Sequence, residues 1–412
     1  MKQIDVVGLS GDSPLSLHPS ARMALEKADI LYGSERQLAL VPGYKANYRQ
    51  IPSPFSQLQA EITQLMTPEH AAEHMVLLAS GDPLFYGIGG WLTRWIKGVN
   101  LCFHPQPSAI QLAFSRIGKP WEQACVLSVH GRPLSTLRRE AGRHTLLAVL
   151  TDNNNHPIAI AQALVDMHFG DSTIWVAEDL ETRSEKVSCF SAKELAQSTQ
   201  TFSPLNVVII ETRGQSVLSP SFPGLPNTAF STGSPAGQGM LTKREVRLAA
   251  LAQLQPPPGT TGWDIGAGCG GLAVEWARWS IQSRIYAIET NPARLEHLHI
   301  NQQRFGVESN LQIVAGRAPD ALQALPTPHS IYLGGSQGQA TEILAYCWER
   351  LAPGGRIVIP AVTLETRAAL VTLAQGKPSE WLEIAVASGK RAGPLTMMQP
   401  QRPVLLLTLE KS

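Results

Sequence analysis

The chain has 412 residues, which is too long for one ordinary core and predicts two domains of about 200 residues each. Its net charge of +1, without a long run of lysine or arginine, argues against a nucleic-acid partner. No apolar run reaches the ~18 residues of a membrane span, and the N-terminus does not resemble a signal peptide, so we expect a cytoplasmic protein. The five cysteines are widely spaced and form no Cys-x-x-Cys pair. We therefore expect reduced thiols and no metal site.

The first half alternates short apolar runs with helical patterns, which predicts α/β layers. The expected strands are 4–9, 30–32, 75–79, 101–104, 126–129, 145–150, 173–177 and 206–210. The expected helices include 20–27, 57–66, 109–117 and 158–167.

Residues 214–239 interrupt this alternation. Glycine, proline and serine make up about half of this window, a composition that is typical of a linker or a loosely packed arm. We therefore place a first domain at 1–212, a linker at 213–239 and a second domain at 240–412.

The second half begins with an expected helix at 243–253. The expected strands are 262–265, 284–288, 311–314, 330–333, 356–360, 382–387 and 404–409, with helices from the glycine-rich loop to Trp279 and at 292–305. This order predicts a doubly wound, Rossmann-like sheet. No helix is expected between the last two strands, which indicates a terminal antiparallel hairpin.

A glycine-rich loop, Asp264-Ile-Gly-Ala-Gly-Cys-Gly-Gly271, joins the first strand of this half to its helix. Glycines permit a tight turn and the close approach of a ligand to the backbone. Glu289 ends the next strand, 23 residues after Gly266, where an acid can accept hydrogen bonds from ribose hydroxyls. The loop therefore predicts a nucleoside-cofactor site.

The glycine spacing alone leaves the cofactor open, because Gly266, Gly268 and Gly271 also satisfy the dinucleotide pattern. Asp264 favours a cofactor with a cationic centre over one with a pyrophosphate. The pattern Asp-x-Gly-x-Gly-x-Gly resembles class I S-adenosylmethionine (SAM) methyltransferases.

Further motifs narrow this resemblance: Thr242-Lys-Arg-Glu-Val-Arg247, Glu289-Thr-Asn-Pro-Ala-Arg294, Gly316-Arg-Ala-Pro-Asp320 and Gly334-Gly335. Together they resemble the C15-methylating, decarboxylating domain of cobalamin biosynthesis, over about residues 222–412. The resemblance implies SAM contacts from Thr242, Gly266, Ala267, Gly268, Cys269, Gly270, Glu289 and Ala318.

In the first half, Ser80-Gly-Asp-Pro-Leu-Phe-Tyr-Gly87 follows an apolar strand. Gly-Asp-Pro forms a sharp turn and is weak evidence when it stands alone. It is followed by Pro105-Gln-Pro-Ser-Ala-Ile-Gln111, Ser128-Val-His-Gly-Arg132 and Leu150-Thr-Asp152. This series resembles the tetrapyrrole methylases (class III SAM methyltransferases) over about residues 1–212, and within them the domain that methylates C5.

That resemblance implies a SAM site lined by Gly81, Asp82, Phe85, Ser108, Ala109 and Thr151, and a substrate trough with Gly8 and Asp12. Many tetrapyrrole methylases have a Gly-Pro-Gly turn after the first strand, where this chain has Leu9-Ser-Gly-Asp12. The substrate contacts at this loop therefore do not follow from the resemblance. His130 and Arg132 are further candidate substrate contacts.

Together the two resemblances imply SAM-dependent methylation of precorrin-6B, or its cobalt form, at C5 and C15, with loss of CO2 from the ring C acetate to give precorrin-8. Arginine forks suit the carboxylates of such a substrate, and the second-half candidates are Arg244, Arg247, Arg317 and Arg391. We expect no metal or pyridoxal group in catalysis, name no catalytic side chain, and expect a homo-oligomer.

Two alternatives remain open from the residues. The first is a tetrapyrrole methylase fused to an NAD-dependent domain, as in sirohaem synthesis, although the order of halves and Asp264 count against it. The second is an RNA-modifying protein built from the same folds, which the near-neutral charge opposes. The sequence gives neither the metal state of the substrate nor the order of the two methylations.

Overall fold

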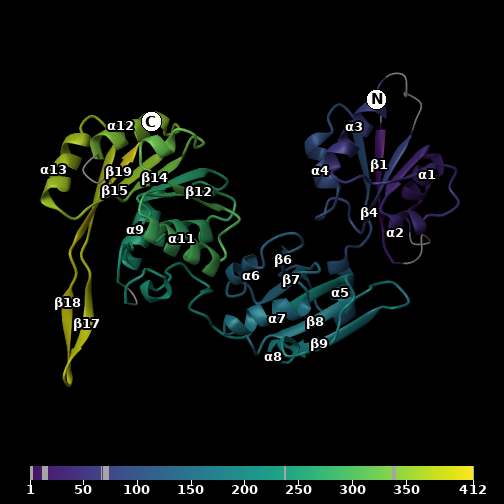
Figure 1. The fold of residues 1–412 in the computed structure, drawn as a ribbon, viewed down its shortest axis with the longest axis horizontal. Coiled ribbons are helices and arrows are strands. Elements are labelled where there is room, and N and C mark those ends of the chain that lie inside the picture. Colours follow the sequence, from purple (N-terminus) through teal and green to yellow (C-terminus); the bar gives the residue numbers. More distant parts are fainter. Residues whose placement is uncertain are drawn as a thin grey trace. The chain divides into compact units, whose positions relative to one another are not determined.

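The computed structural model describes residues 3–11, 17–65, 67, 74–235, 238–335 and 340–411. Two compact units make up the chain (Figure 1). The first comprises Met1–Arg132, Leu146–Gln162 and Asp171–Glu211, and the second comprises Pro133–Thr145, Ala163–Gly170 and Thr212–Ser412. No helix in the described ranges has the length and apolar character needed to cross a membrane.

The first unit begins with a parallel sheet in the order β3-β2-β4-β1-β5. Its strands are β1 (Gln3–Leu9), β2 (Ile30–Gly33), β3 (Asn47–Gln50), β4 (Met75–Ser80) and β5 (Asn100–His104). The helices α1 (Pro19–Lys27), α2 (Glu35–Ala39), α3 (Phe55–Leu65) and α4 (Gly89–Trp95) alternate with these strands. Buried apolar side chains form one cluster on each face of the sheet. The central strands are therefore continuous apolar runs, as expected of a parallel sheet covered on both faces.

A second, mixed sheet of the first unit has the order β6-β7-β10-β8-β9. Its strands are β6 (Cys125–Ser128), β7 (Leu146–Leu150), β8 (Thr173–Glu178), β9 (Lys186–Ser191) and β10 (Asn206–Glu211). The helices of this part of the chain are α5 (Ala109–Ile117), α6 (Ser135–Glu140), α7 (Pro157–Asp166) and α8 (Ala192–Ala196). Only β6 and β7 are parallel, and the other pairs are antiparallel.

The second unit contains a seven-stranded sheet in the order β13-β12-β11-β14-β15-β19-β16. The strands are β11 (Thr261–Ile265), β12 (Arg284–Glu289), β13 (Leu311–Ala315), β14 (Ser330–Leu333), β15 (Arg356–Ala361), β16 (Ser379–Ile384) and β19 (Val404–Glu410). The first five are parallel, and the chain reverses its direction of winding between β11 and β14. In open α/β sheets, ligands bind at the carboxyl ends of the strands beside such a switch point.

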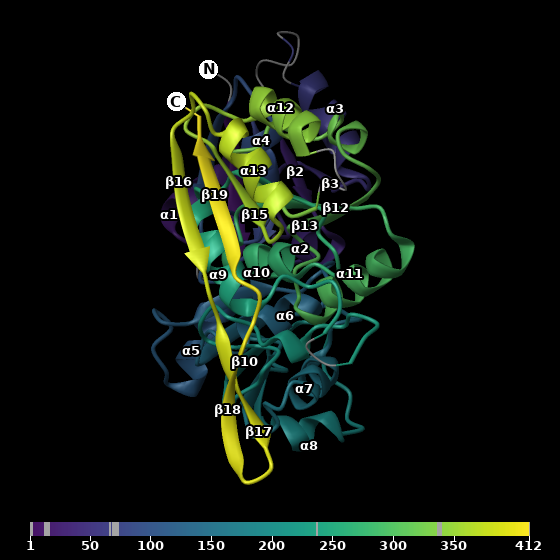
Figure 2. The same ribbon diagram turned by 90° about the vertical axis from the view of Figure 1, so that its left-hand side faces the viewer.

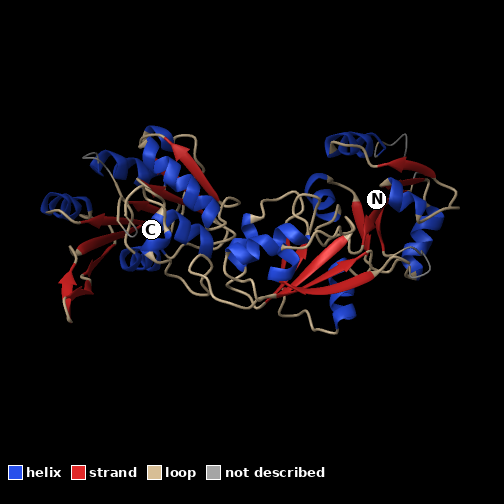
Figure 3. Ribbon diagram, turned by 60° about the horizontal axis from the view of Figure 1, so that its bottom comes forward, coloured by secondary structure: helices blue, strands red, loops and turns tan. Residues whose placement is uncertain are grey.

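Helices cover both faces of this sheet (Figure 3). The helices α9 (Arg244–Leu254), α10 (Gly271–Trp279) and α11 (Pro292–Arg304) contribute to one apolar cluster. The helices α12 (Ala340–Arg350) and α13 (Leu364–Leu373) contribute to the cluster on the other face. Two short 3-10 helices, η3 (Asn227–Ala229) and η4 (Asp320–Leu322), complete the unit.

A long hairpin of β17 (Ala387–Ala392) and β18 (Leu395–Pro400) extends beyond β16 and β19, as Figures 1 and 2 both show. Every residue of its two strands is exposed.

The predicted fold class is confirmed, with α/β layers in both halves and a doubly wound sheet in the second. The predicted terminal antiparallel pair also forms, between β16 and β19, although β16 begins at Ser379 and β17–β18 was not expected. The sequence also missed β3 and β9. Both are edge strands with few buried residues, so they lack the apolar run by which a strand is recognised.

The segment predicted to be a loose linker differs most from its expectation. Leu225, Ala229 and Phe230 are buried in the core of the second unit. A few well-placed apolar side chains therefore anchor this segment, although its average composition is typical of a linker.

Candidate active sites

The glycine-rich loop of the second unit follows β11 and ends where α10 begins. Gly266, Gly268 and Gly270 have φ values of 76°, 59° and 86°, a left-handed conformation that favours glycine. A Cβ on Gly266 would lie 2.7 Å from the amide nitrogen of Gly335, and one on Gly268 would lie 2.6 Å from the carbonyl oxygen of Met240. The loop therefore needs glycine both for its conformation and for the close approach of its neighbours.

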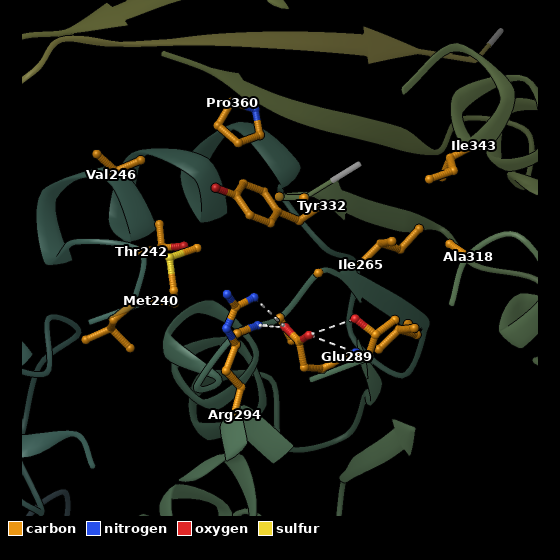
Figure 4. A pocket seen from close by; sticks show the side chains of 18 of the residues that line it. Met240, Thr242, Val246, Ile265, Glu289, Arg294, Ala318, Tyr332, Ile343 and Pro360 are labelled. Atoms are coloured by element: carbon orange, nitrogen blue, oxygen red, sulfur yellow. Dashed lines mark hydrogen bonds and ion pairs between the residues drawn. The ribbon is translucent and has the colours of Figure 1, made fainter. Parts of the chain in front are cut away.

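A cavity of about 510 Å³ opens at this loop, at the carboxyl ends of the parallel strands (Figure 4). Its volume is in the usual range for a small-molecule site. Six of the predicted SAM contacts line it: Thr242, Gly266, Ala267, Gly268, Glu289 and Ala318. Arg317, a predicted substrate contact, lines it as well.

The Glu289 carboxylate is held rigidly at the cavity wall and is only 4% exposed. One oxygen accepts a hydrogen bond from the Gly268 amide at 2.9 Å, and Arg294 lies 3.8 Å from the same oxygen. The other oxygen accepts from the amides of Thr290 at 2.7 Å and Asn291 at 2.9 Å. These bonds fix the carboxylate beneath the loop, with its position set before any ligand binds.

Asp264 was expected to lie beside a cationic ligand, but its side chain is buried behind the cavity wall. Its carboxylate is 1% exposed and accepts a hydrogen bond from the Ala273 amide at 2.9 Å. Burial, with a smaller contribution from the charge of Glu289, raises the pKa of Asp264 to about 7. Asp264 is not among the residues that line the cavity, so any effect on a ligand acts through the intervening atoms.

Two other predicted SAM contacts of the second half, Cys269 and Gly270, do not line the cavity. Cys269 is buried in the core. A Cβ on Gly270 would overlap the side chain of Leu298. The conformation of the loop turns these two residues toward the interior.

Arg247, a predicted substrate contact, is not among the residues that line the cavity. Its side chain is fully buried and forms an ion pair with Glu275 at 3.4 Å. This position of the helix Arg244–Leu254 faces the core in the folded unit. Arg244 pairs with Glu245 at 2.9 Å and does not line the cavity. Arg391 lies on the exposed strand β17.

Several cavity residues were missed by sequence reasoning, namely Tyr332, Ile343, Pro360, Val362 and Val404. Tyr332 lies on β14, hydrogen-bonds with Thr242, and has its pKa raised by burial and by the nearby Asp264. A usable signal was present for Pro360, because it ends a predicted strand and such ends line the switch-point crevice. Val404 belongs to an antiparallel strand and gave no such signal.

In the first unit, the ends of β1 and β4 and the loop after β5 meet. The Gly81 amide donates to the Leu9 carbonyl at 2.8 Å, and the Gly81 carbonyl accepts from Gln106 at 3.2 Å. A Cβ on Gly8 would overlap the Gly81 carbonyl oxygen, and one on Gly81 would lie 3.1 Å from the Cα of Ser108. The structure therefore brings Gly8, a predicted trough residue, next to Gly81 and Ser108, two predicted SAM contacts.

Ser108 and Asp82 use their side chains for local turns. The Ser108 hydroxyl accepts from the Gln111 amide at 3.3 Å, in a capping box that starts α5 at Ala109. The Asp82 carboxylate accepts from the Leu84 amide at 2.8 Å. Phe85 packs against the core of the second sheet.

Thr151 and His130 lie together at the end of β7. The Thr151 hydroxyl donates to the Asn206 side chain at 2.8 Å, and the Thr151 carbonyl lies 3.0 Å from Nδ1 of His130. A cavity of about 310 Å³ adjoins them, lined by Asp152, His156, Gln200, Phe202 and Asn206 among others. Of these five, only Asp152 belongs to a motif that the sequence showed.

Arg132 lies 5.6 Å from the ring centre of Tyr86, so its guanidinium stacks on an aromatic face. Asp12, the other predicted trough residue, lies outside the described residues.

Two family models match the chain. One, for tetrapyrrole (corrin/porphyrin) methylases, matches residues 4–196, and one for a precorrin methyltransferase domain matches residues 236–411. A precorrin-6Y C(5,15)-methyltransferase [decarboxylating] from Sinorhizobium sp is 32% identical over 98% of this chain and 95% of its own length. The protein of the same name from Mycobacterium tuberculosis is 33% identical over 99% of this chain and all of its own.

The chain belongs to the precorrin-6Y C(5,15)-methyltransferase (decarboxylating) family. A solved C-terminal domain of a member from Rhodobacter capsulatus is 35% identical and covers 46% of this chain and 98% of its own, with a TM-score of 0.42. Full-length relatives with one name support the methyltransferase prediction over both the NAD-dependent and the RNA-modifying alternatives.

Proposed function

We propose that this chain transfers methyl groups from SAM to C5 and C15 of precorrin-6B, or its cobalt form, and removes CO2 from the ring C acetate to give precorrin-8. The observation that carries the proposal is the match to precorrin-6Y C(5,15)-methyltransferases over nearly the whole chain. The cavity at the Gly266–Gly270 loop supplies a site of suitable kind in the second unit.

We assign one SAM site to each unit. The residues of the second unit fit the methyl donor: the crowded glycines admit a ligand against the backbone, and the fixed Glu289 carboxylate can accept ribose hydroxyls. In the first unit the proposed site includes Gly81, Ser108, Ala109 and Thr151. The domains of this proposal are 1–212 and 240–412, with the segment 213–239 joined to the second.

The methyl donor supplies an electrophilic methyl group, so the protein's task is to position the acceptor carbon and to exclude water. Two exposed apolar side chains at the cavity, Met240 and Val362, can contact the face of a macrocycle. Arg317 lines the same cavity, and within the described ranges its side chain has no hydrogen bond or ion pair. It is therefore the arginine best placed to receive a substrate carboxylate.

We also propose that the chain is a homo-oligomer assembled through the β17–β18 hairpin. A two-stranded hairpin alone is marginally stable in water. This one exposes Leu395, Met397 and Met398 at 69%, 63% and 66%. A second copy that packs on these side chains would remove them from water.

The full chain with Glu289→Gln tests the proposed division of labour. Incubated with SAM and precorrin-6B, the wild type should give a product with two added methyl groups that has lost CO2. The variant should give mainly a product with one added methyl group that retains the acetate, because only the second unit's site is damaged. Mass spectrometry of the products distinguishes these cases.

The exposed Glu296 on α11 does not line the cavity, so Glu296→Gln is the matched control and should behave as the wild type. Loss of neither methylation in Glu289→Gln would remove Glu289 from the methyl-donor site.

A further inference from the structure

The segment that precedes α9 forms one wall of the cavity. We call residues 224–235 and 238–243 the strap. Five of its residues line the cavity, namely Gly239, Met240, Leu241, Thr242 and Lys243. The strap contributes no strand to the sheet and only the short η3 helix. Its position must therefore be fixed by side chains from elsewhere in the unit.

Glu275, fully buried on α10, holds the start of the strap. One of its oxygens accepts from the Gly224 amide at 2.9 Å, and the other accepts from the Leu225 amide at 3.0 Å. The second oxygen also pairs with Arg247. Trp279 donates to the first oxygen at 3.0 Å. A buried carboxylate is tolerated only when hydrogen bonds and an opposite charge satisfy it in this way. The burial of Glu275 therefore depends on the main chain keeping this course at Gly224 and Leu225.

Arg247 extends the same network to the cavity wall. Its guanidinium donates to the carbonyl of Thr242 at 2.8 Å and to the side chain of Asn227 at 2.8 Å, and it also donates to the Leu225 carbonyl. The guanidinium stacks over the Phe230 ring at 4.9 Å. Arg247 therefore ties the beginning of the strap to its end, at the residue whose hydroxyl faces Tyr332 in the cavity (Figure 4).

The strap is also bonded to the glycine-rich loop. The Cys269 amide donates to the Met240 carbonyl at 3.1 Å. The fully buried Asn301 donates to the carbonyls of Ser231 and Cys269, both at 2.8 Å, and accepts from the Ser231 amide at 2.8 Å. Because strap and loop share these bonds, a displacement of the strap changes the opposite walls of the cavity together.

We propose that Arg247 and Glu275 are positioning residues of the methyl-donor site, which hold the strap as a wall of the cavity and so set the affinity for SAM without touching it. The identity of the ligand rests on the proposed function. The geometry of the strap does not.

The full-length double variant Arg247→Met/Glu275→Gln tests the proposal, because it removes the network without leaving one buried charge unpaired. With release of CO2 as the assay, we expect the KM for SAM to rise about tenfold and kcat to change less than twofold. A tenfold rise corresponds to the loss of one or two hydrogen bonds. Amide hydrogen exchange of 238–243 should be faster by a similar factor and should regain protection when SAM is added. Arg247→Lys, which keeps the charge but not the fork, should lie between.

The matched control is Arg356→Met/Glu410→Gln, which removes a partly exposed ion pair of 2.9 Å between β15 and β19. It should leave both the KM and the exchange of the strap unchanged. A folded double variant with wild-type KM and wild-type strap exchange would overturn the proposal, and so would a fall in kcat alone. If SAM protects no peptide of the wild-type second unit, the proposed cofactor is wrong, whereas the exchange of the strap without SAM still decides the role of the two residues.

Discussion

Single residues of the second unit shape the cavity in different ways, through backbone conformation, hydrogen bonds and burial. Gly266 and Gly268 are required by conformation and by contact, and both requirements follow from one tight turn. Glu289 is fixed by three backbone amides. Asp264 is different, because its environment raises its pKa to about 7 from an ordinary value of 3.8. This shift makes its protonation part of the stability of the unit.

We predict that Asp264 makes stability fall as the pH rises. Its folded pKa is raised, so the folded state holds the proton more tightly than the unfolded state between pH 3.8 and about 7. This contribution is complete below the unfolded pKa and is lost as the pH rises to about 7. Asp264→Asn stays neutral, and its Tm should exceed that of the wild type by several degrees at about pH 8. Calorimetry of the wild type and of Asp264→Asn at about pH 8 and near the unfolded pKa of 3.8 checks this.

The same two proteins at low pH serve as the control, because the higher Tm of Asp264→Asn should disappear near the unfolded pKa of Asp264. A Tm difference that stays constant across this pH range would show that folding does not raise the pKa of Asp264.

At the scale of elements, the second unit combines a seven-stranded sheet with two segments outside it, the strap and the β17–β18 hairpin. The strap is held by side chains of α9, α10 and α11, and it carries part of the cavity wall. The β17–β18 hairpin has backbone pairing but no buried side chain among its strand residues. A two-stranded hairpin of this kind is only marginally stable on its own.

Replacement of 387–400 by a two-residue turn between β16 and β19 should therefore yield a folded but smaller assembly. These two strands already pair through six register positions, so the sheet does not depend on the hairpin. Light scattering coupled to size-exclusion chromatography measures the change in mass. An unchanged mass would show that the hairpin does not form the interface, and a monomeric wild type would contradict the oligomer itself.

At the scale of the whole molecule, the second unit includes residues before 240, where composition placed the start of the second domain. Apolar side chains at Leu225, Ala229 and Phe230 complete its core, and Glu275 and Arg247 depend on main-chain partners in the same segment. The segment after the first domain is thus part of the second unit's stability.

A fragment of residues 240–412 should consequently be less stable than one of residues 213–412. The shorter fragment exposes core side chains and removes the main-chain partners of the buried ion pair at Gly224 and Leu225, which costs about 3–5 kcal/mol. Urea unfolding of the two fragments measures the difference. Equal midpoints and slopes would mean that 213–239 contributes nothing, as a linker would.

The sequence by itself determined the alternation of strands and helices, the glycine-rich loop and the position of Glu289. These depend on short-range rules, namely apolar periodicity, the conformational freedom of glycine and the spacing between the ends of neighbouring parallel strands. Thr242 and Ala318 followed only from the family resemblance, since no local rule selects them.

Only the tertiary structure decided the burial of Arg247, the place of Tyr332 at the cavity and the course of the strap, and it turned Cys269 and Gly270 away from the cavity. A surface arginine and a buried one have the same local sequence, because burial depends on what the distant chain places over the side chain. Leu225 and Glu275 are 50 residues apart, so no local pattern could pair them. The loop was recognisable from its residues, but the wall that completes its cavity was not.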